Sequence, residues 1–550
     1  MQHQRYRSVP PVPLKDRTWP DQVLTSAPSW CSVDLRDGNQ ALIEPMGSDR
    51  KIQFFKTLVQ VGFKEIEVGF PAASQTDFDF VRLLIEGGHI PDDVTIQVLT
   101  QAREDLIART MEALKGAKNV VVHLYNSTST LQRRVVFGLE KDAIRDLAVR
   151  GTKWIKEAVK VLEGTRVVFE YSPESFTGTE VDYALEVCDA VMKAWNPAPD
   201  EKVILNLPAT VEMAGPNHYA DQIEYMSRNL KRRDQIILSL HAHNDRGCAV
   251  AATELALMAG ADRVEGTLFG NGERTGNVDI VTVALNLFTQ GVDPHLDFSD
   301  LPALVEVFER CNRLPVHPRH PYAGQLVFTA FSGSHQDAIK KGLAALRSDE
   351  SPFWEVPYLP IDPADVGRQY EPIIRINSQS GKGGISFVLE QAYGFSVPKE
   401  LAAEFSKIIQ HITDETGREL MPVDIFNAFE QTYLAPGHLV LSDFSARHEG
   451  KDRGTLNVEL KDGEATRQFT ASGNGPIDAF VRGLEKDLGL TYRVTAYSEH
   501  AMGEGENAEA VAYVRLRAED GRSRFGVGRD QDIVAASLQA VLSAANGLRG

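Results

Sequence analysis

The strongest constraint on the fold of this chain is a unit that recurs eight times between Trp30 and Leu268: a short β-prone run, a loop and an amphipathic helix. The β-prone runs lie at 33–35, 66–68, 96–99, 120–123, 167–170, 203–206, 236–243 and 264–268. Strands that alternate with helices form a parallel sheet, so eight units predict an α/β fold, a (β/α)8 TIM barrel, at residues 31–325. A doubly wound open sheet is the alternative, but no dinucleotide-binding glycine fingerprint follows the first run.

The rest of the chain divides into three further segments. Residues 1–30 hold several prolines and mixed charges without an apolar stretch, which predicts an extended N-terminal arm and no signal peptide. The alternation stops near residue 325, and residues 326–435 are expected to form a helical linker of small subdomains. Residues 436–550 contain an internal repeat.

The repeat has a spacing of 56 residues: Val458-Glu459-Leu460 recurs as Val514-Arg515-Leu516, Phe469 as Phe525, and Ile477-Asp478-Ala479 as Ile533-Val534-Ala535. Each copy is expected to contain strands, a glycine-bearing turn (473–475 or 526–528) and a helix. Two copies predict a pseudo-symmetric α+β regulatory domain that senses a ligand. A plain dimerisation module is the alternative.

Composition narrows the range of partners. The formal net charge of -18 argues against nucleic acid or an anionic membrane as the main partner. No apolar run approaches the length needed to cross a bilayer. The four cysteines lie tens of residues apart without ligand-type spacing, which indicates a reducing, cytoplasmic compartment.

Polar residues follow the β-prone runs where a barrel of this class carries its site, at the carboxyl ends of the strands. The candidates are Arg36, Asp37, His123, Ser172, Glu174, Thr210, His241, His243 and Asn277. A purely structural barrel needs no such ring of ionisable groups, so the pattern favours catalysis.

A metal site is expected among these residues. His241 and His243 are two positions apart on one strand, so both imidazoles point to the same side. Only the eighth strand separates the first strand from the seventh in a closed barrel, so Asp37 can converge with them. One carboxylate and two imidazoles leave positions open for a chelating 2-oxo acid, as in a Lewis-acid site. The oxygen donors favour Mg²⁺ or Mn²⁺, while the imidazoles leave Zn²⁺ open. Arg36 could pair with charge developing on the ketone oxygen, or form a structural ion pair.

Three motifs resemble the signature of the acyl-CoA Claisen-condensing family, which holds 2-isopropylmalate, homocitrate and citramalate synthases. They are Leu35-Arg36-Asp37-Gly38-Asn39-Gln40, His241-Ala242-His243-Asn244-Asp245 and Gly272-Glu273-Arg274-Thr275-Gly276-Asn277. The likeness extends through 74–77, 125–129, 171–175, 206–210 and a loop expected at Ser334-His335-Gln336-Asp337. With the C-terminal repeat it covers almost the whole chain, and it is similar to the long-form 2-isopropylmalate synthases in particular.

The resemblance implies a role for each candidate. The metal ligands would be Asp37, His241, His243 and Asn277, and the substrate-binding residues Arg36, His123, Ser172 and Thr210. Acid–base work would fall to Glu174, His335 and Tyr358 beside Arg36, with His335 as the candidate base. Because His335 lies outside the barrel, the linker must fold over a barrel mouth, in the same subunit or in the other subunit of a homodimer.

The implied reaction is condensation of acetyl-CoA with 2-oxoisovalerate and thioester hydrolysis to 2-isopropylmalate and CoA, with leucine as allosteric inhibitor. Homocitrate or citramalate synthase is the nearest alternative, since these differ only in the pocket for the oxo-acid side chain. A lyase is disfavoured because the loop after the eighth run lacks the cysteine of the related hydroxymethylglutaryl-CoA lyases. A non-catalytic amino-acid sensor would be expected to lose some of Asp37, Glu174, His241 and His243, and all four are present.

Overall fold

The computed structural model describes residues 9–330, 332–348, 353–370, 382–416, 420–448, 454–502 and 508–549. The first eight residues of the expected N-terminal arm lie outside this part of the chain. By its contacts the chain divides into two compact units: residues 1–328 with 361–369, and residues 329–360 with 370–550. Among the described residues, no helix has both the length and the apolar character needed to cross a membrane.

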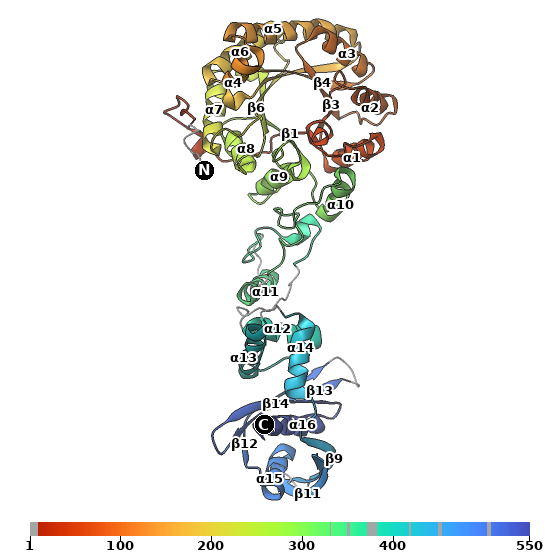
Figure 1. Ribbon diagram of the computed structural model, residues 1–550, viewed down its shortest axis with the longest axis vertical. Helices are drawn as coiled ribbons and strands as arrows, with labels where there is room; N and C mark the ends of the chain where they lie inside the picture. The colour runs from red at the N-terminus through yellow and green to blue at the C-terminus, as the bar shows by residue number, and fades with distance from the viewer. Residues whose placement is uncertain are drawn as a thin grey trace. The chain divides into compact units, whose positions relative to one another are not determined.

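The first unit is a closed barrel of eight parallel strands (Figure 1). The strands are β1 (Ser29–Ser32), β2 (Glu65–Gly69), β3 (Thr95–Gln101), β4 (Asn119–Ser127), β5 (Arg166–Glu174), β6 (Val203–Ala209), β7 (Ile236–Ala242) and β8 (Arg263–Gly266). Because β1 pairs with both β2 and β8, the sheet has no free edge. The predicted barrel is confirmed, and the doubly wound sheet is excluded.

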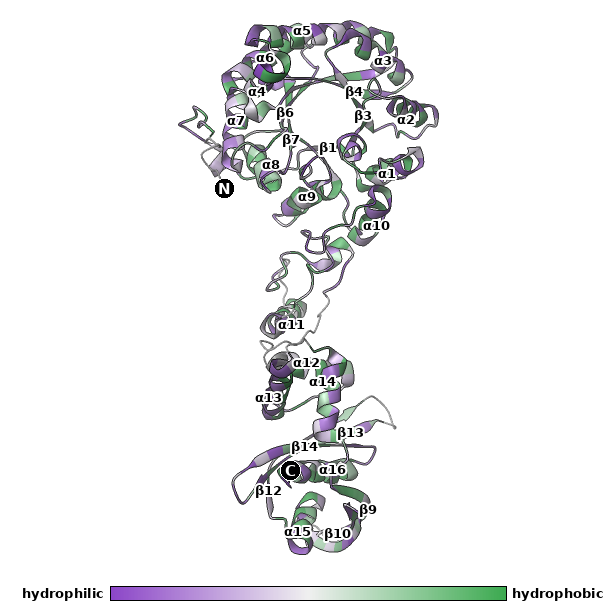
Figure 2. Cartoon of the chain, in the orientation of Figure 1, coloured by the Kyte–Doolittle hydropathy of each residue, from purple (hydrophilic) through white to green (hydrophobic). Residues whose placement is uncertain are grey.

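Helices surround the strands (Figure 1). They are α1 (Ser48–Val61), α2 (Gln75–Glu86), α3 (Glu104–Leu114), α4 (Thr130–Gln132), α5 (Lys141–Ala158), α6 (Val181–Trp195), α7 (Pro216–Asn229), α8 (Ala249–Met258), α9 (Ile280–Phe288) and α10 (Leu301–Asn312). α6 buries Tyr183, Val187, Val191 and Trp195, which recur at helical spacing, and Figure 2 shows polar and apolar faces on the barrel helices. This one-sided burial holds the helices against the barrel.

The first strand ends earlier than the sequence indicated. β1 stops at Ser32, although the β-prone run was expected to reach residue 35. Asp34–Gly38 instead form a π-helical turn, η3. Such turns are rare and occur mostly at functional sites. Here the turn buries Asp37 at the carboxyl end of the barrel.

The described part of the N-terminal arm is fastened to α7. The Arg17 guanidinium makes two 2.6 Å bonds to the Asp221 carboxylate, and the Thr18 hydroxyl donates to Glu224 at 2.6 Å. Val12 and Leu14 are buried. The arm therefore covers two carboxylates that would otherwise face solvent on α7.

The second unit begins with helices: α11 (Gly333–Ser348), α12 (Lys382–Tyr393), α13 (Lys399–Thr416) and α14 (Pro422–Phe429). The expected helical linker is thus confirmed. Ser334–Asp337 lie in the first turn of α11, so the prediction of a loop there is wrong. The helices from α12 onward share a core with Val511, Tyr513, Phe525 and Val527 of the sheet that follows.

The C-terminal module contains two copies of one β-β-β-α unit, which confirms the predicted internal repeat. The first copy is β9 (Leu439–His448), β10 (Gly454–Asp462), β11 (Ala465–Gly473) and α15 (Pro476–Leu488). The second is β12 (Tyr492–Met502), β13 (Glu509–Ala518), β14 (Ser523–Asp530) and α16 (Ile533–Arg549). Each copy forms its own three-stranded antiparallel sheet.

The constant spacing of 56 residues is wrong beyond the second hairpin. Val458 stands opposite Phe469, whereas Val514 stands opposite Gly526, so the loop of the second copy holds one more residue. Phe469 therefore corresponds to Gly526 and not to Phe525. Because neighbouring strand residues face opposite sides, this slip puts Phe469 in the core under α15 and Phe525 on the face covered by the linker helices.

The prediction of a turn at Gly526-Val527-Gly528 is also wrong, because these residues lie inside β14. A Cβ atom at Gly526 would stand 2.1 Å from the Ala540 carbonyl oxygen and 2.2 Å from the Ala544 nitrogen. The glycines therefore permit close approach of α16 to the sheet. Of the turn expected at 473–475, Gly473 is the last residue of β11, and residues 474–475 form a bend between β11 and α15.

Candidate active site

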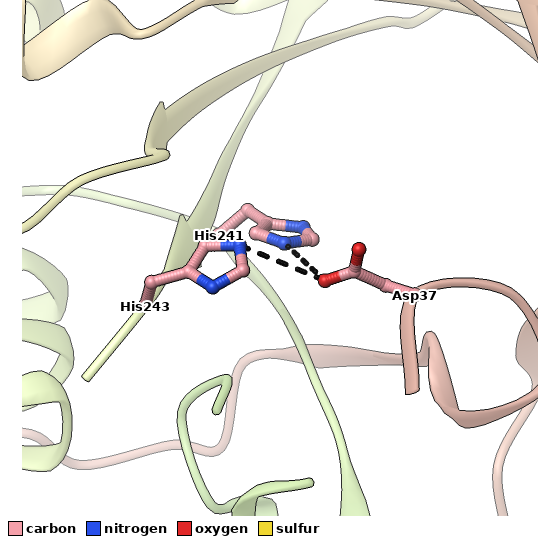
Figure 3. Close-up of side chains that lie close together, drawn as sticks. All are labelled: Asp37, His241 and His243. Atoms are coloured by element: carbon pink, nitrogen blue, oxygen red, sulfur yellow. Dashed lines mark ion pairs between the residues drawn. The ribbon is translucent and has the colours of Figure 1, made fainter. Parts of the chain in front are cut away.

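Asp37, His241 and His243 converge at the carboxyl end of the barrel (Figure 3). Asp37 follows β1 on η3, His241 lies on β7, and His243 comes directly after that strand. The Asp37 Oδ2 atom is 3.5 Å from His241 Nε2 and 3.6 Å from His243 Nε2. These distances leave room for one ion among the three side chains. Asn277 forms a backbone bridge to His243.

Several buried polar atoms of this group have no hydrogen-bond partner among the described residues: Asp37 Oδ2, His243 Nδ1 and Asn277 Oδ1. Buried polar atoms are normally paired, because desolvation without a partner is costly. A carboxylate oxygen, an imidazole nitrogen and an amide oxygen are all ligands of divalent ions. The residues present therefore fit a metal.

The electrostatics of the cluster also suit a cation. Burial opposes the charge on Asp37, but Arg36 and the two histidines hold the pKa of Asp37 well below its usual range. Burial opposes a charge on His241, yet the Asp37 and Glu265 carboxylates raise its pKa to about 9. Burial and the neighbouring His241 lower the pKa of His243 to about 4. A bound divalent ion would replace the His241 proton, since a metal-binding imidazole is neutral.

A cavity of about 280 Å³ opens at this cluster. It brings together eight residues singled out from the sequence: Arg36, Asp37, His123, Ser172, Glu174, Thr210, His241 and His243. Phe70, Leu99 and Pro208 add apolar lining. The cavity has the size and mixed lining of a small-molecule site.

Arg36 is anchored at both ends of its guanidinium group. Its Nε donates to Glu67, and its Nη1 donates to Asp37 Oδ1 at 2.9 Å. The head group is therefore an ion-pair partner and also part of the cavity wall. The ion pair expected from the sequence is therefore present, while pairing of Arg36 with charge on a ketone oxygen stays a prediction.

The other barrel candidates are bonded to one another or to neighbouring loops. His123 Nε2 lies 2.7 Å from Ser172 Oγ, and Ser127 donates to Glu174. The Thr210 hydroxyl accepts a 2.9 Å bond from the Ser175 backbone. Each side chain is thus held in place before any ligand binds.

His335 and Tyr358 belong to the second unit, where their rings stack with centroids 4.0 Å apart. Tyr358 is 61% exposed. The two side chains thus form a pair, while their part in the chemistry of the barrel stays a prediction.

Two groups of residues were given no role in the predictions from the sequence. Arg274 pairs with Asp245 at 2.7 Å and donates to the Thr210 carbonyl at 2.5 Å, which braces three loops at the mouth. Beneath the ligands lies a layer of buried polar side chains: Glu67, Gln97, Glu170, Asn206, Arg263 and Glu265. The signal was available, since these residues interrupt apolar runs that should be buried on both faces, and a buried charge must be paired.

Family models match the chain in three parts. The HMGL-like model matches residues 27–308, which is the barrel just described. A model described as alpha-isopropylmalate synthase, post-catalytic domain-like, matches 325–390. The LeuA allosteric (dimerisation) domain matches 419–549 and supports a dimeric assembly. Fold and site thus define an HMGL-like barrel protein with a C-terminal LeuA module.

Curated relatives narrow this class. A 2-isopropylmalate synthase of Rhodospirillum rubrum is 59% identical over 99% of this chain and 98% of its own length. One from Pseudomonas putida is 58% identical over 98% of this chain and 96% of its own length. The chain belongs to the 2-isopropylmalate synthase family.

Solved structures show a more distant similarity. A hydroxymethylglutaryl-CoA lyase from Pseudomonas aeruginosa is 21% identical, with a TM-score of 0.42, over 52% of this chain and 92% of that one. A lyase from Brucella melitensis is 17% identical, with a TM-score of 0.40, over 52% and 97%.

Proposed function

We propose that this chain condenses acetyl-CoA with 2-oxoisovalerate and hydrolyses the thioester, releasing 2-isopropylmalate and CoA. The observation that carries the proposal is the 58–59% identity to relatives named 2-isopropylmalate synthase along nearly their whole length. The cavity at the barrel mouth supports it, because it combines ligand-type residues with an apolar wall.

Asp37, His241, His243 and Asn277 are proposed to hold a divalent ion. Mg²⁺ is favoured by the oxygen donors, with Mn²⁺ and Zn²⁺ as alternatives. When bound, the ion supplies Lewis acidity to the ketone of the 2-oxo acid. The unpartnered oxygens of Asp37 and Asn277 support this ligand set.

The remaining residues would bind and move protons. Arg36, held by Glu67 and Asp37, presents a fixed positive charge to the developing alkoxide. His123, Ser172 and Thr210 would orient the oxo acid. Proton removal from the acetyl methyl group is assigned to His335 acting with Glu174, and Tyr358 to the acid–base steps beside them. His335 and Tyr358 would come from the same subunit or from the partner in a homodimer.

A panel of 2-oxo acids in a CoA-thiol release assay tests the substrate. 2-Oxoisovalerate should give the highest kcat/KM, because Phe70, Leu99 and Pro208 suit a branched alkyl group. A methylene changes apolar binding by about 1–3 kcal/mol, so 2-oxobutyrate should react more slowly and 2-oxoglutarate hardly at all. Preference for 2-oxoglutarate or pyruvate would reassign the chain to homocitrate or citramalate synthesis. No CoA release with any oxo acid would refute condensation altogether.

We also propose leucine as an allosteric inhibitor that binds the C-terminal module. A cavity of about 330 Å³ lies there between η10 (Glu430–Leu434), β9, β14 and α16. Leu439, Val527 and Leu542 offer apolar lining, and Glu430 and Arg529 offer charges of both signs. This chemistry suits a free amino acid with an alkyl side chain. Inhibition requires leucine to favour one state of the enzyme, by a coupling of about 1–3 kcal/mol.

Calorimetry and leucine inhibition test this proposal together. Ala435 is exposed at the cavity, so Ala435→Trp should fill the cavity and weaken both binding and inhibition while turnover without leucine persists. Ala465→Trp, on an exposed hairpin of the same module, serves as the control. If the wild-type enzyme did not bind leucine, the proposal would be refuted, and dimerisation would be the one remaining role of the module.

A further inference from the structure

Glu265 on β8 lies beneath one of the two candidate histidine ligands. Its Oε2 atom is 2.8 Å from His241 Nδ1, on the side of the ring away from Asp37. The Glu265 side chain is fully buried. A carboxylate that accepts from Nδ1 keeps the proton on that nitrogen and leaves the Nε2 lone pair free.

Three further side chains fix the Glu265 carboxylate. Oε1 accepts from Arg263 Nη1 at 2.9 Å and from Gln97 Nε2 at 2.7 Å, and Oε2 accepts from Asn206 Nδ2 at 3.1 Å. These donors come from three different strands. The position of the carboxylate is therefore set by the barrel core and not by a loop.

The second histidine has no such support. His243 Nδ1 is buried without a hydrogen-bond partner among the described residues. The two imidazoles, equivalent in the sequence motif, thus differ in structure: the ring of His241 is oriented from below, and that of His243 is held by its strand end.

We propose that Glu265 is a positioning residue for the metal centre, which acts by holding His241 with Nε2 toward the ion. The inference rests on the proposed metal-dependent function. Outer-shell carboxylates of this kind raise ligand basicity and fix the ring, and their loss typically lowers metal affinity about 10–100-fold. Glu265 does not contact substrate and has no part in the bond-making steps.

A second ion beneath the first would be another use for this carboxylate. Glu67, His123 and Glu265 also lie close enough together to hold one. However, Gln97 Nε2 donates to Glu67 Oε2 at 2.8 Å and to Glu265 Oε1 at 2.7 Å. An N–H donor facing both carboxylates takes the place that a cation would need, so the layer is a hydrogen-bond network.

Mn²⁺ binding to the full-length enzyme without substrates tests the proposal, with free Mn²⁺ measured by electron paramagnetic resonance. Glu265→Gln should lower the affinity about 10–100-fold, because the amide keeps the size but loses the charge. Glu65→Gln is the control: the Glu65 carboxylate pairs with the same Arg263 at 2.7 Å but not with His241. An equal loss in both variants would overturn the proposal, because it would reflect a general disturbance of the buried layer.

Double variants test whether Glu265 affects metal binding through His241. In a His241→Ala background, Glu265→Gln should have no further effect on the residual Mn²⁺ affinity, since Glu265 acts only through His241. In a His243→Ala background the full effect should persist. The same loss in both backgrounds would overturn the assignment to His241.

A spectroscopic measurement on the wild-type enzyme guards against variants that fail to fold. With ¹⁵N-labelled histidine and Zn²⁺ bound, the His241 ring should carry its proton on Nδ1 and its metal on Nε2, and the resonance is identified by its loss in His241→Ala. Metal on Nδ1 would overturn the proposal. Because none of these measurements uses turnover, they stay decisive even if the oxo-acid panel refutes the proposed reaction.

Discussion

The mouth of the barrel and the packed face of the second C-terminal repeat differ in how their buried groups affect stability. At the mouth, Asp37 and His243 are buried with polar atoms that lack partners among the described residues. Under α16, Gly526 leaves no space even for a methyl group. The mouth therefore keeps binding capacity at some cost in stability, while the repeat uses close packing for stability alone.

The two repeats extend this comparison. In the first copy, Phe469 on the strand faces Gly483 on the helix, where an added Cβ would stand 2.1 Å from the ring. In the second copy, Gly526 on the strand faces Ala540 on the helix. The first copy fills this contact with a phenyl ring, whereas the second brings the helix backbone directly against the strand, so the same topology is packed in two ways.

The largest effect should come from the mouth. His241→Ala should strongly weaken metal binding and lower turnover by about 10³-fold, because several kcal/mol of carbonyl polarisation are lost. The unfolding midpoint should move by less than about 3 °C, since a ligand at the open face contributes little to the core. Metal analysis, CoA release and thermal unfolding check this, with the exposed His411→Ala as control. Loss of the fold in His241→Ala would contradict the view that residues at the mouth contribute little to stability.

The next effect belongs to the second repeat. Gly526→Val should destabilise the module by about 3 kcal/mol or more, because its side chain would overlap the backbone of α16. Chemical unfolding and light scattering should show loss of the module and of the dimer, while Mn²⁺ still binds the barrel. Gly475→Ala is the control, since that backbone is extended and no atom lies within 4 Å of the added methyl. An undisturbed module in Gly526→Val would contradict the close packing.

His335 tests whether chemistry is confined to the first unit. His335→Ala should lower kcat by about 10²-fold, the usual range for a general acid–base, with Mn²⁺ affinity unchanged. Asp337→Ala, on an exposed neighbour in α11 that pairs with Lys341, should leave kcat as it is. If both variants kept the kcat of the wild-type enzyme, the catalytic residues would all lie in the barrel, and the second unit would have no part in the chemistry.

The smallest effect should be in the first repeat. Gly483→Ala should lower the free energy of unfolding by about 1 kcal/mol, because the added methyl group overlaps the Phe469 ring. The loss stays small because the ring can move aside and because alanine favours the helix by about 1 kcal/mol over glycine. Adding Phe469→Leu should restore the stability by relieving the overlap. Chemical unfolding of the single and double variants measures the coupling, and additive effects would exclude contact between the two positions.

Most of the barrel could be predicted because its signals are local. The β-prone runs, the intervening helices and the strand-end polar residues each follow from short stretches of sequence. The turn at Asp34–Gly38 could not be predicted, because the β-prone run continues to Leu35 and only the closed sheet shows where pairing stops. The repeat likewise appeared constant in spacing until strand register showed the extra residue.

The candidate site was predictable to the extent that its residues share the ends of strands. Asp37, His241 and His243 converge because the closed barrel brings the first and seventh strands near each other, as expected. The support beneath them was not foreseen, since Glu265 meets His241 and Gln97 only through the interior of the barrel. Those contacts join residues of different strands and leave no motif.

By itself the sequence determined the barrel, the helical linker, the doubled module and the identity of the residues at the mouth. Periodicity and composition depend on neighbours along the chain, so they can be recognised in the sequence alone. Only the tertiary structure decided which buried polar groups pair, how Glu265 makes His241 differ from His243, and which face Phe525 occupies. Those outcomes depend on strand register and on approach distances of a few ångströms between distant segments, which no local pattern encodes.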